Sequence, residues 1–411
     1  MHVANQGMVL LGGAMIAGLL AALGFQGVGD PAQVAGEQID NSQPVGFPGS
    51  VIETKAVNDA VNDPGKFAGH EKCVDCHRTE VKSWMASKHS TRAFDLLRTS
   101  ENALDYAESL GIAPGEIARS SLCLDCHASS KNNSDHTPGV VPSVTCESCH
   151  GGADGEDGWL NRHAVYGTRS TSRQQETEEH YLLREEFCRE AGQIRSSQLY
   201  EMTKRCFSCH VIADEALSEA GHTHGAGFEY VEKSMGEVRH NFFLKPDENL
   251  KVATLWLEAR QGEARTATGR LRVMFLLGQM VDLEVSLDNL SGGTEENDYT
   301  DELIGRIEDA YELLAEDVVE ELEPQEDDPG FAEIAATVGI VEPIYEALDE
   351  DGFDPENKDI YSKAAREIAL QAKEFAKRNG NELSAIDELE LFSDDEFDGV
   401  YRPVESRIEK R

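Results

Sequence analysis

The sequence predicts a mainly α-helical protein in two parts: a segment rich in cysteine and histidine with little regular structure, then a C-terminal helical bundle. Two observations divide the chain. No cysteine follows Cys209 and no histidine follows His240. From about Lys245, long amphipathic patterns with a helical period replace the short ones that precede them. Strand signals are weak throughout, which favours the mainly α class.

Four copies of Cys-x-x-Cys-His organise the first part. Two thiols three residues apart lie on one side of a helical turn, where they can add to the two vinyl groups on one edge of a porphyrin. The histidine that follows is then carried beneath the ring and can bind the iron. The pattern therefore predicts four covalently bound c-type haems. The copies are Cys73, Cys76 and His77; Cys123, Cys126 and His127; Cys146, Cys149 and His150; and Cys206, Cys209 and His210.

Zinc or a dithiol pair is the alternative use of such cysteines. Neither requires a histidine after every second cysteine, and here all four pairs are followed by one. The motifs use eight of the nine cysteines, which favours haem. Cys188 is left over, either as an unpaired structural residue or for an intermolecular disulfide. We expect a multihaem cytochrome c domain whose core is filled by haem. Four porphyrins would supply the buried apolar surface that side chains otherwise provide, which fits an aromatic content of only 7%.

The charge is strongly acidic. Asp and Glu number 77 against 37 Lys and Arg, a net charge of −40. Such a surface excludes nucleic acid and anionic membrane surfaces as partners. It suits a basic redox partner, or it is simply a solvated acidic face.

The N-terminal segment, residues 1–25, predicts export. Met8 to Phe25 carries no charge and is as long as a short membrane span. No Lys or Arg precedes Lys55 and no clean cleavage site follows, so the segment fits a membrane anchor better than a cleaved signal peptide. Residues 26–67 have the composition of a flexible linker.

Short helices are expected in the haem domain, residues 68–243, and longer ones in the bundle, residues 244–380. Residues 381–411 form an acidic tail that we expect to be irregular. Residues 129–143 are expected to be a polar loop. The expected helices of the haem domain are 79–98, 101–110, 176–204, 214–220 and 230–239, and those of the bundle are 250–290, 301–322, 331–348 and 358–378.

A second histidine opposite each motif histidine would complete the coordination of the iron and suit electron transfer, whereas an open position would allow a small molecule to bind. The favoured candidates are His89, His163 and His240, followed by His222. The remaining histidines of the region are weaker candidates: His70, His136, His180 and His224.

The segments EKCVDCHRTEVKSWMASKHSTRAF, CLDCH, VTCESCHGGA and KRCFSCH together resemble the tetrahaem cytochrome c-554 family. The resemblance covers roughly Gly69 to Phe243 and leaves out the C-terminal helices. It implies haems in stacked pairs, and periplasmic electron transfer from an enzyme to membrane carriers. The identity of the donor does not carry over.

The same resemblance implies a ligand for each haem. His89 would serve the fourth haem, His163 the first and His240 the third, while the second haem, at His127, would be five-coordinate. The sequence departs from that pattern at His222 and His224, within Gly-His-Thr-His. His222 would either replace His240 at the third haem or cover the open face of the second.

Electron transfer through four haems is the favoured function, ahead of any enzyme activity. The alternative is a multihaem reductase or oxidase that acts on a small nitrogen or sulfur species at a five-coordinate second haem. The C-terminal helices would serve docking into a larger complex or would cover the haem domain. What lies opposite His127 decides between the first two hypotheses.

Overall fold

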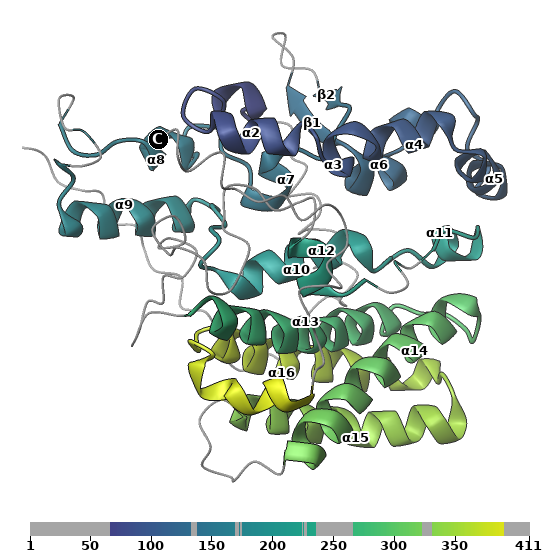
Figure 1. Ribbon diagram of the computed structural model, residues 1–411. Coiled ribbons are helices and arrows are strands. Elements are labelled where there is room, and N and C mark those ends of the chain that lie inside the picture. Colours follow the sequence, from purple (N-terminus) through teal and green to yellow (C-terminus); the bar gives the residue numbers. More distant parts are fainter. Residues whose placement is uncertain are drawn as a thin grey trace, which may run out of the picture. The chain divides into compact units, whose positions relative to one another are not determined.

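The computed structural model describes residues 66–132, 138–168, 172, 175–223, 225, 228–235, 266–322 and 331–389. Its described part is mainly α-helical, as expected (Figure 1). The N-terminal segment 1–25, the linker up to residue 65, His136, His224 and His240 lie outside it. Within the described residues, no helix is long and apolar enough to cross a membrane.

Short helices connected by turns make up the motif-bearing part. The expected helix 79–98 is instead three helices. The first break lies at Ser87, whose hydroxyl donates to Trp84 O and accepts from Ser90 N, and the second lies at Arg92. The helices up to the second motif are η1 (His70–Lys72), α2 (Arg78–Trp84), α3 (Lys88–Thr91), α4 (Ala93–Thr99), α5 (Glu101–Ser109), η2 (Ile117–Arg119) and α6 (Ser121–His127).

The expected loop 129–143 contains an antiparallel hairpin of β1 (Ser129–Asn132) and β2 (Pro138–Val141), so this prediction was wrong. The expected helix 176–204 is broken at Gly192, whose φ of 93° is costly for any residue with a Cβ. The helices of this stretch are α7 (Cys146–His150), α8 (Leu160–His163), α9 (Glu178–Glu190), α10 (Leu199–His210), α11 (Glu215–Glu219) and α12 (Tyr230–Met235).

Four long helices form the C-terminal part. Helix α13 contacts α10 on one side and α14 and α16 on others (Figure 1). It is buried along nearly its whole length, which marks it as the central helix. The elements are α13 (Ala267–Leu290), α14 (Asp298–Glu312), the π-helical continuation η4 (Leu313–Glu320), α15 (Ala332–Asp351), η5 (Pro355–Asn357), α16 (Lys358–Phe375) and η6 (Asn381–Leu389).

One hydrophobic core runs through the bundle and into the motif-bearing part. Phe207 of α10 and Val231 of α12 belong to the same cluster of buried side chains as the bundle residues. Leu383 and Ile386 also belong to it, so the beginning of the expected irregular tail is helical and packed.

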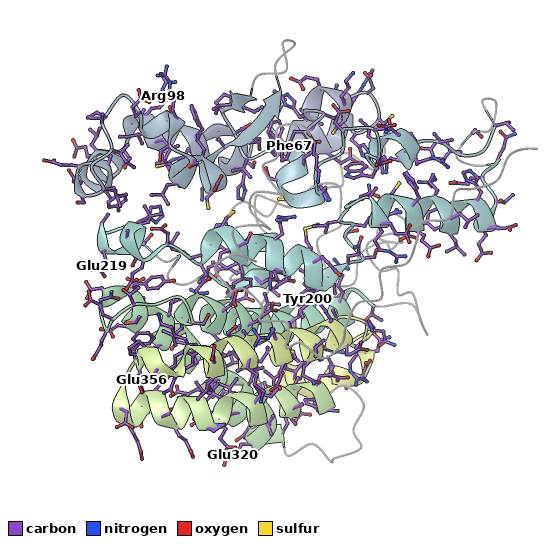
Figure 2. The ribbon with its side chains drawn as sticks, turned by 180° about the vertical axis from the view of Figure 1, so that it is seen from behind. Phe67, Arg98, Tyr200, Glu219, Glu320 and Glu356 are labelled. Carbon is purple, nitrogen blue, oxygen red and sulfur yellow. The ribbon has the colours of Figure 1, made fainter. Side chains whose placement is uncertain are left out.

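Buried polar side chains on α13 find partners across this contact. Tyr200 lies on α10 (Figure 2). Its hydroxyl donates to both oxygens of the Glu284 carboxylate, at 2.9 and 3.0 Å. Lys204 forms an ion pair with the same carboxylate. Because a buried carboxylate is costly without such partners, these bonds fix the fourth motif's helix on the bundle.

Candidate haem-binding site

The four motifs each adopt a turn or helix that brings their side chains to one side. The first forms a turn after η1, closed by a bond of 2.8 Å from His77 N to Cys73 O. The second fills most of α6, the third is α7, and the fourth ends α10. All nine cysteines are free thiols. The eight motif thiols are therefore available for attachment.

The motif thiols meet in pairs across the fold. Cys73 and Cys146 share a hydrogen bond, which lowers the pKa of Cys73 and raises that of Cys146. Cys126 and Cys209 share another, which raises the pKa of Cys126 and lowers that of Cys209. The first motif thus lies beside the third, and the second beside the fourth. Helix α7 of the third motif also contacts α10 of the fourth.

Three motif histidines face a histidine from elsewhere in the chain. The ring centres are 5.9 Å apart for His77 and His163, and 6.1 Å for His89 and His210. For His127 and His222 the separation is 6.2 Å. With a metal–nitrogen bond of about 2 Å on each side, two imidazoles that share one metal have ring centres about 6 Å apart. All three pairs fit an iron between them.

His150 of the third motif is held by Ile194. Its Nδ1 donates to Ile194 O at 2.8 Å, and its own carbonyl accepts from Ile194 N at 2.9 Å. His240, the ligand expected for the third haem, lies outside the described residues, so its role stays a prediction.

Backbone carbonyls set the protonation of the ring nitrogens at the second motif. His127 Nδ1 donates to Ala93 O at 2.6 Å, and His222 Nδ1 donates to Thr223 O at 2.9 Å. In each ring this leaves the Nε2 lone pair free for a metal. Burial lowers the pKa of His127, which keeps the ring neutral, as a ligand must be.

At the first motif, the distal histidine is held by residues that sequence reasoning missed. The Gln193 amide nitrogen lies 3.0 Å from His163 Nδ1, and the buried amide oxygen has no hydrogen-bond partner. Exchanging the amide oxygen and nitrogen by a half-turn gives the oxygen a partner, because it then accepts the Nδ1 proton of His163. Arg184 donates to His163 O at 2.9 Å and pairs in a bidentate way with Glu176. Burial lowers the pKa of His163 to about 4.

Glu147, inside the third motif, is a second residue whose role the sequence did not reveal. It is 1% exposed, and its carboxylate accepts three backbone N–H groups, those of Ala68, Gly69 and Ala153, at 2.8 to 2.9 Å. The bonds connect the chain just before the first motif to the third motif. No spacing in the sequence indicates this contact, because the bonded residues are 78 and 79 positions apart.

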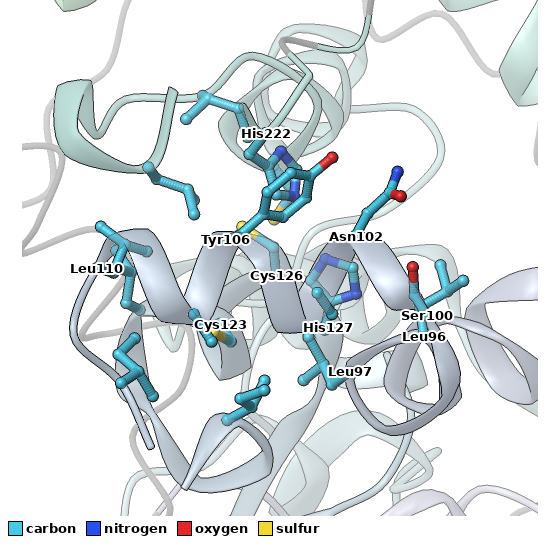
Figure 3. Close-up of a pocket in the computed structure, with 18 residues that line it drawn as sticks. Leu96, Leu97, Ser100, Asn102, Tyr106, Leu110, Cys123, Cys126, His127 and His222 are labelled. Atoms are coloured by element: carbon cyan, nitrogen blue, oxygen red, sulfur yellow. The ribbon is translucent and has the colours of Figure 1, made fainter. Parts of the chain in front are cut away.

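A pocket of about 260 Å³ lies beside the second motif (Figure 3). One side of the pocket is α6, which contributes Cys123, Cys126 and His127. At another side lie the rings of His222 and Tyr106, close to each other. Most of the remaining lining is apolar and comes from Leu96, Leu97, Ala103, Ala107, Leu110, Ile112, Ile117, Leu122, Ile212 and Leu217. Cys209 of the fourth motif also lines the pocket. Apolar walls around the two thiols of the second motif and two facing imidazoles suit a porphyrin.

The weaker histidine candidates have other neighbours. His70 packs on Trp84 with ring centres 4.9 Å apart, and His180 Nδ1 lies 2.7 Å from Glu176. Cys188 is 1% exposed, and its thiol donates to Trp159 O, which is the structural role expected for an unpaired cysteine.

Comparison with known families supports c-type haem as the cofactor. Residues 72–151 match the family of cytochrome c554 and c-prime. The matched segment contains the first three motifs and agrees with the resemblance drawn from the sequence. No curated protein and no solved structure matches the chain. A cytochrome c554 segment carries covalently bound c-type haem and serves electron transfer, and c-type cytochromes are typically extracytoplasmic.

Proposed function

We propose that the chain is a periplasmic electron-transfer protein that binds four c-type haems, one at each motif. The observation that carries the proposal is the set of three histidine pairs at 5.9 to 6.2 Å, each formed between different segments of the chain. A bound c-type haem supplies an iron that takes up and returns one electron. The fourth motif repeats the pattern of the matched segment.

The protein's own residues would hold each group rigidly. The motif cysteines form the thioether bonds, and the motif histidines supply one ligand each. The second ligand would be His163 at the first site, His222 at the second, His240 at the third and His89 at the fourth. The thiol contacts support a chain of neighbouring sites in the order first, third, fourth, second.

His222 argues for an electron carrier over an enzyme. The reductase or oxidase alternative needs an open iron at His127, and the His222 ring faces His127 at 6.2 Å. Of the two roles left open for His222, the pairing favours the second haem over the third. In this respect the chain differs from the five-coordinate pattern that the resemblance implies.

The partner we propose is a redox protein with a basic docking face. The net charge of −40 supports it, because charge complementarity steers association. Neither nucleic acid nor an anionic surface suits this charge. Attachment to a membrane through residues 8–25 is part of the proposal, as is the docking role of the C-terminal helices.

Mass spectrometry and spectroscopy of the exported full-length protein test the proposal. We expect a mass increase of four haems and a spectrum of low-spin iron only. The variant His222→Ala should convert the second haem alone to high spin, and Lys363→Ala, at an exposed position of α16, should leave the spectrum unchanged. Fewer than four haems, or a high-spin haem in the unmodified protein, would contradict the proposal.

A further inference from the structure

We propose that the C-terminal bundle positions His222 and thereby sets the coordination of the second haem. This inference rests on the proposed role of His222 as a ligand and gives the C-terminal helices a task within that site. The residues that position His222 are Arg306, Glu215 and Asn289. We call the described residues between 211 and 235, which carry His222, the His222 segment.

The His222 segment has little structure of its own near the histidine. Helix α11 is one turn long and ends at Glu219. Gly221 and Gly225, on either side of His222, have φ of 93° and 64°. Such a turn carries no regular backbone ladder, so its conformation depends on contacts from outside. His222 N has one local bond, to Leu217 O at 3.2 Å.

The bundle holds the segment before His222. Asn289 of α13 donates to Ile212 O at 3.3 Å. Glu215, the first residue of α11, accepts from Thr294 Oγ1 at 2.9 and 3.0 Å and from Asn297 Nδ2 at 2.7 Å. Both contacts reach from the end of α13 and the turn that follows it. They fix α11, the helix that leads into the His222 turn.

The bundle also holds the segment after His222. Arg306 of α14 donates to Gly225 O at 3.4 Å while its other nitrogens pair with Asp282 of α13 at 2.9 and 2.5 Å. The buried Asp282 thus fixes the guanidinium in place. Further along, Tyr230 packs on Gly278, where any added Cβ would lie 3.0 Å from the Tyr230 Cβ.

The segment is therefore anchored to α13 and α14 on both sides of the histidine. On its other side, His222 meets Tyr106 and His127, which belong to the first half of the chain. The bundle thus presents a ligand to a haem site made by α5 and α6. Its helices supply no haem motif, yet they decide where the sixth ligand of the second haem stands.

Two anchor variants and one matched control test this inference in the haem-loaded, full-length protein. Arg306→Ala removes the contact after His222, and Glu215→Ala removes the contact before it without leaving a buried charge. Arg378→Ala is the control, because Arg378 makes a bidentate pair with Glu333 at 2.8 Å within the bundle. The readouts are the high-spin fraction of the ferric protein and the rate of carbon monoxide binding to the ferrous protein.

We expect both anchor variants to show part or all of the high-spin signal of His222→Ala and faster carbon monoxide binding, while Arg378→Ala shows neither. Adding Arg306→Ala to His222→Ala should produce no further high-spin haem, which separates an effect through His222 from one on the nearby fourth site. If His222→Ala itself stays low-spin, the proposed ligand is wrong. If His222→Ala becomes high-spin but both anchor variants stay low-spin, only the positioning role is overturned.

Discussion

The bundle and the motif-bearing part bury their residues by different means. The bundle has a continuous apolar core, with Leu287 and Ile368 fully buried. Outside the helices that join this core, the motif-bearing part has two small clusters, one around Trp159 and the other around Leu97. A cluster of three or four buried residues does not offset the entropy of ordering so many others. From this difference we predict that the first part folds around its cofactors and the second around its side chains.

Loss of haem attachment should have the largest effect on this contrast. A full-length variant with all eight motif cysteines changed to serine should lose amide-exchange protection in α2 to α7 and keep it in α13 and α16. Helix α10 should keep intermediate protection, because Phe207 belongs to the bundle core. Exchange measured by mass spectrometry checks this. Equal protection of both parts would remove the distinction.

A cavity in the bundle core should have the next largest effect. Leu287→Ala should lower the free energy of unfolding of the bundle by about 2–5 kcal/mol, because Leu287 is fully buried. Below the unfolding temperature, the spectrum of the first haem should not change. Thermal unfolding followed at a haem band and by far-ultraviolet circular dichroism measures both. Leu370→Ala, at an exposed position of α16, is the control.

In the motif-bearing part, the Glu147 carboxylate should be the most sensitive polar group. Glu147→Ala leaves three buried N–H groups without an acceptor, at a cost of about 1–3 kcal/mol for each that stays unsatisfied. Glu147→Gln keeps one acceptor oxygen and should cost less. Urea unfolding of the haem-loaded protein measures the difference. Equal stability of the two variants would show that the backbone finds other partners.

A surface ion pair should have the smallest effect in either part. Lys363 and Glu367 lie one helical turn apart on α16, 3.6 Å from nitrogen to oxygen, and are solvent-exposed. Lys363→Ala should change the stability of the bundle by less than about 0.5 kcal/mol. The midpoint of urea unfolding at low and high salt checks this. A larger loss would mean that the side chain has a partner beyond this pair.

The sequence was informative wherever the signal was local. The Cys-x-x-Cys-His motifs and the amphipathic patterns of α14 to α16 could be read directly. His89 and His163 came from a family resemblance, and the structure puts them opposite His210 and His77. Their role as ligands stays a prediction.

Long-range contacts were beyond sequence reasoning. The position of His222 depends on contacts with residues about a hundred positions away, such as His127, and on contacts of its segment with the bundle. The hairpin at 129–141 was missed because its strands are short and the first of them is polar. The break at Gly192 lay within a helical pattern, where a single glycine is often tolerated. The core shared by α10 and the bundle depends on which helices pack together, and no local pattern in the sequence indicates this.

The close approach of Gly225 to the fourth motif restricts insertions and deletions in the loop between His210 and Gly225. A Cβ at this position would lie 2.1 Å from the carbonyl oxygen of His210, so the backbone there rests directly on the fourth motif. Three residues later, Phe228 stacks on the His210 ring at 4.2 Å. These two contacts fix the register of the turn. We therefore expect an insertion or deletion of one residue between His210 and Gly225 to turn His222 away from the second site.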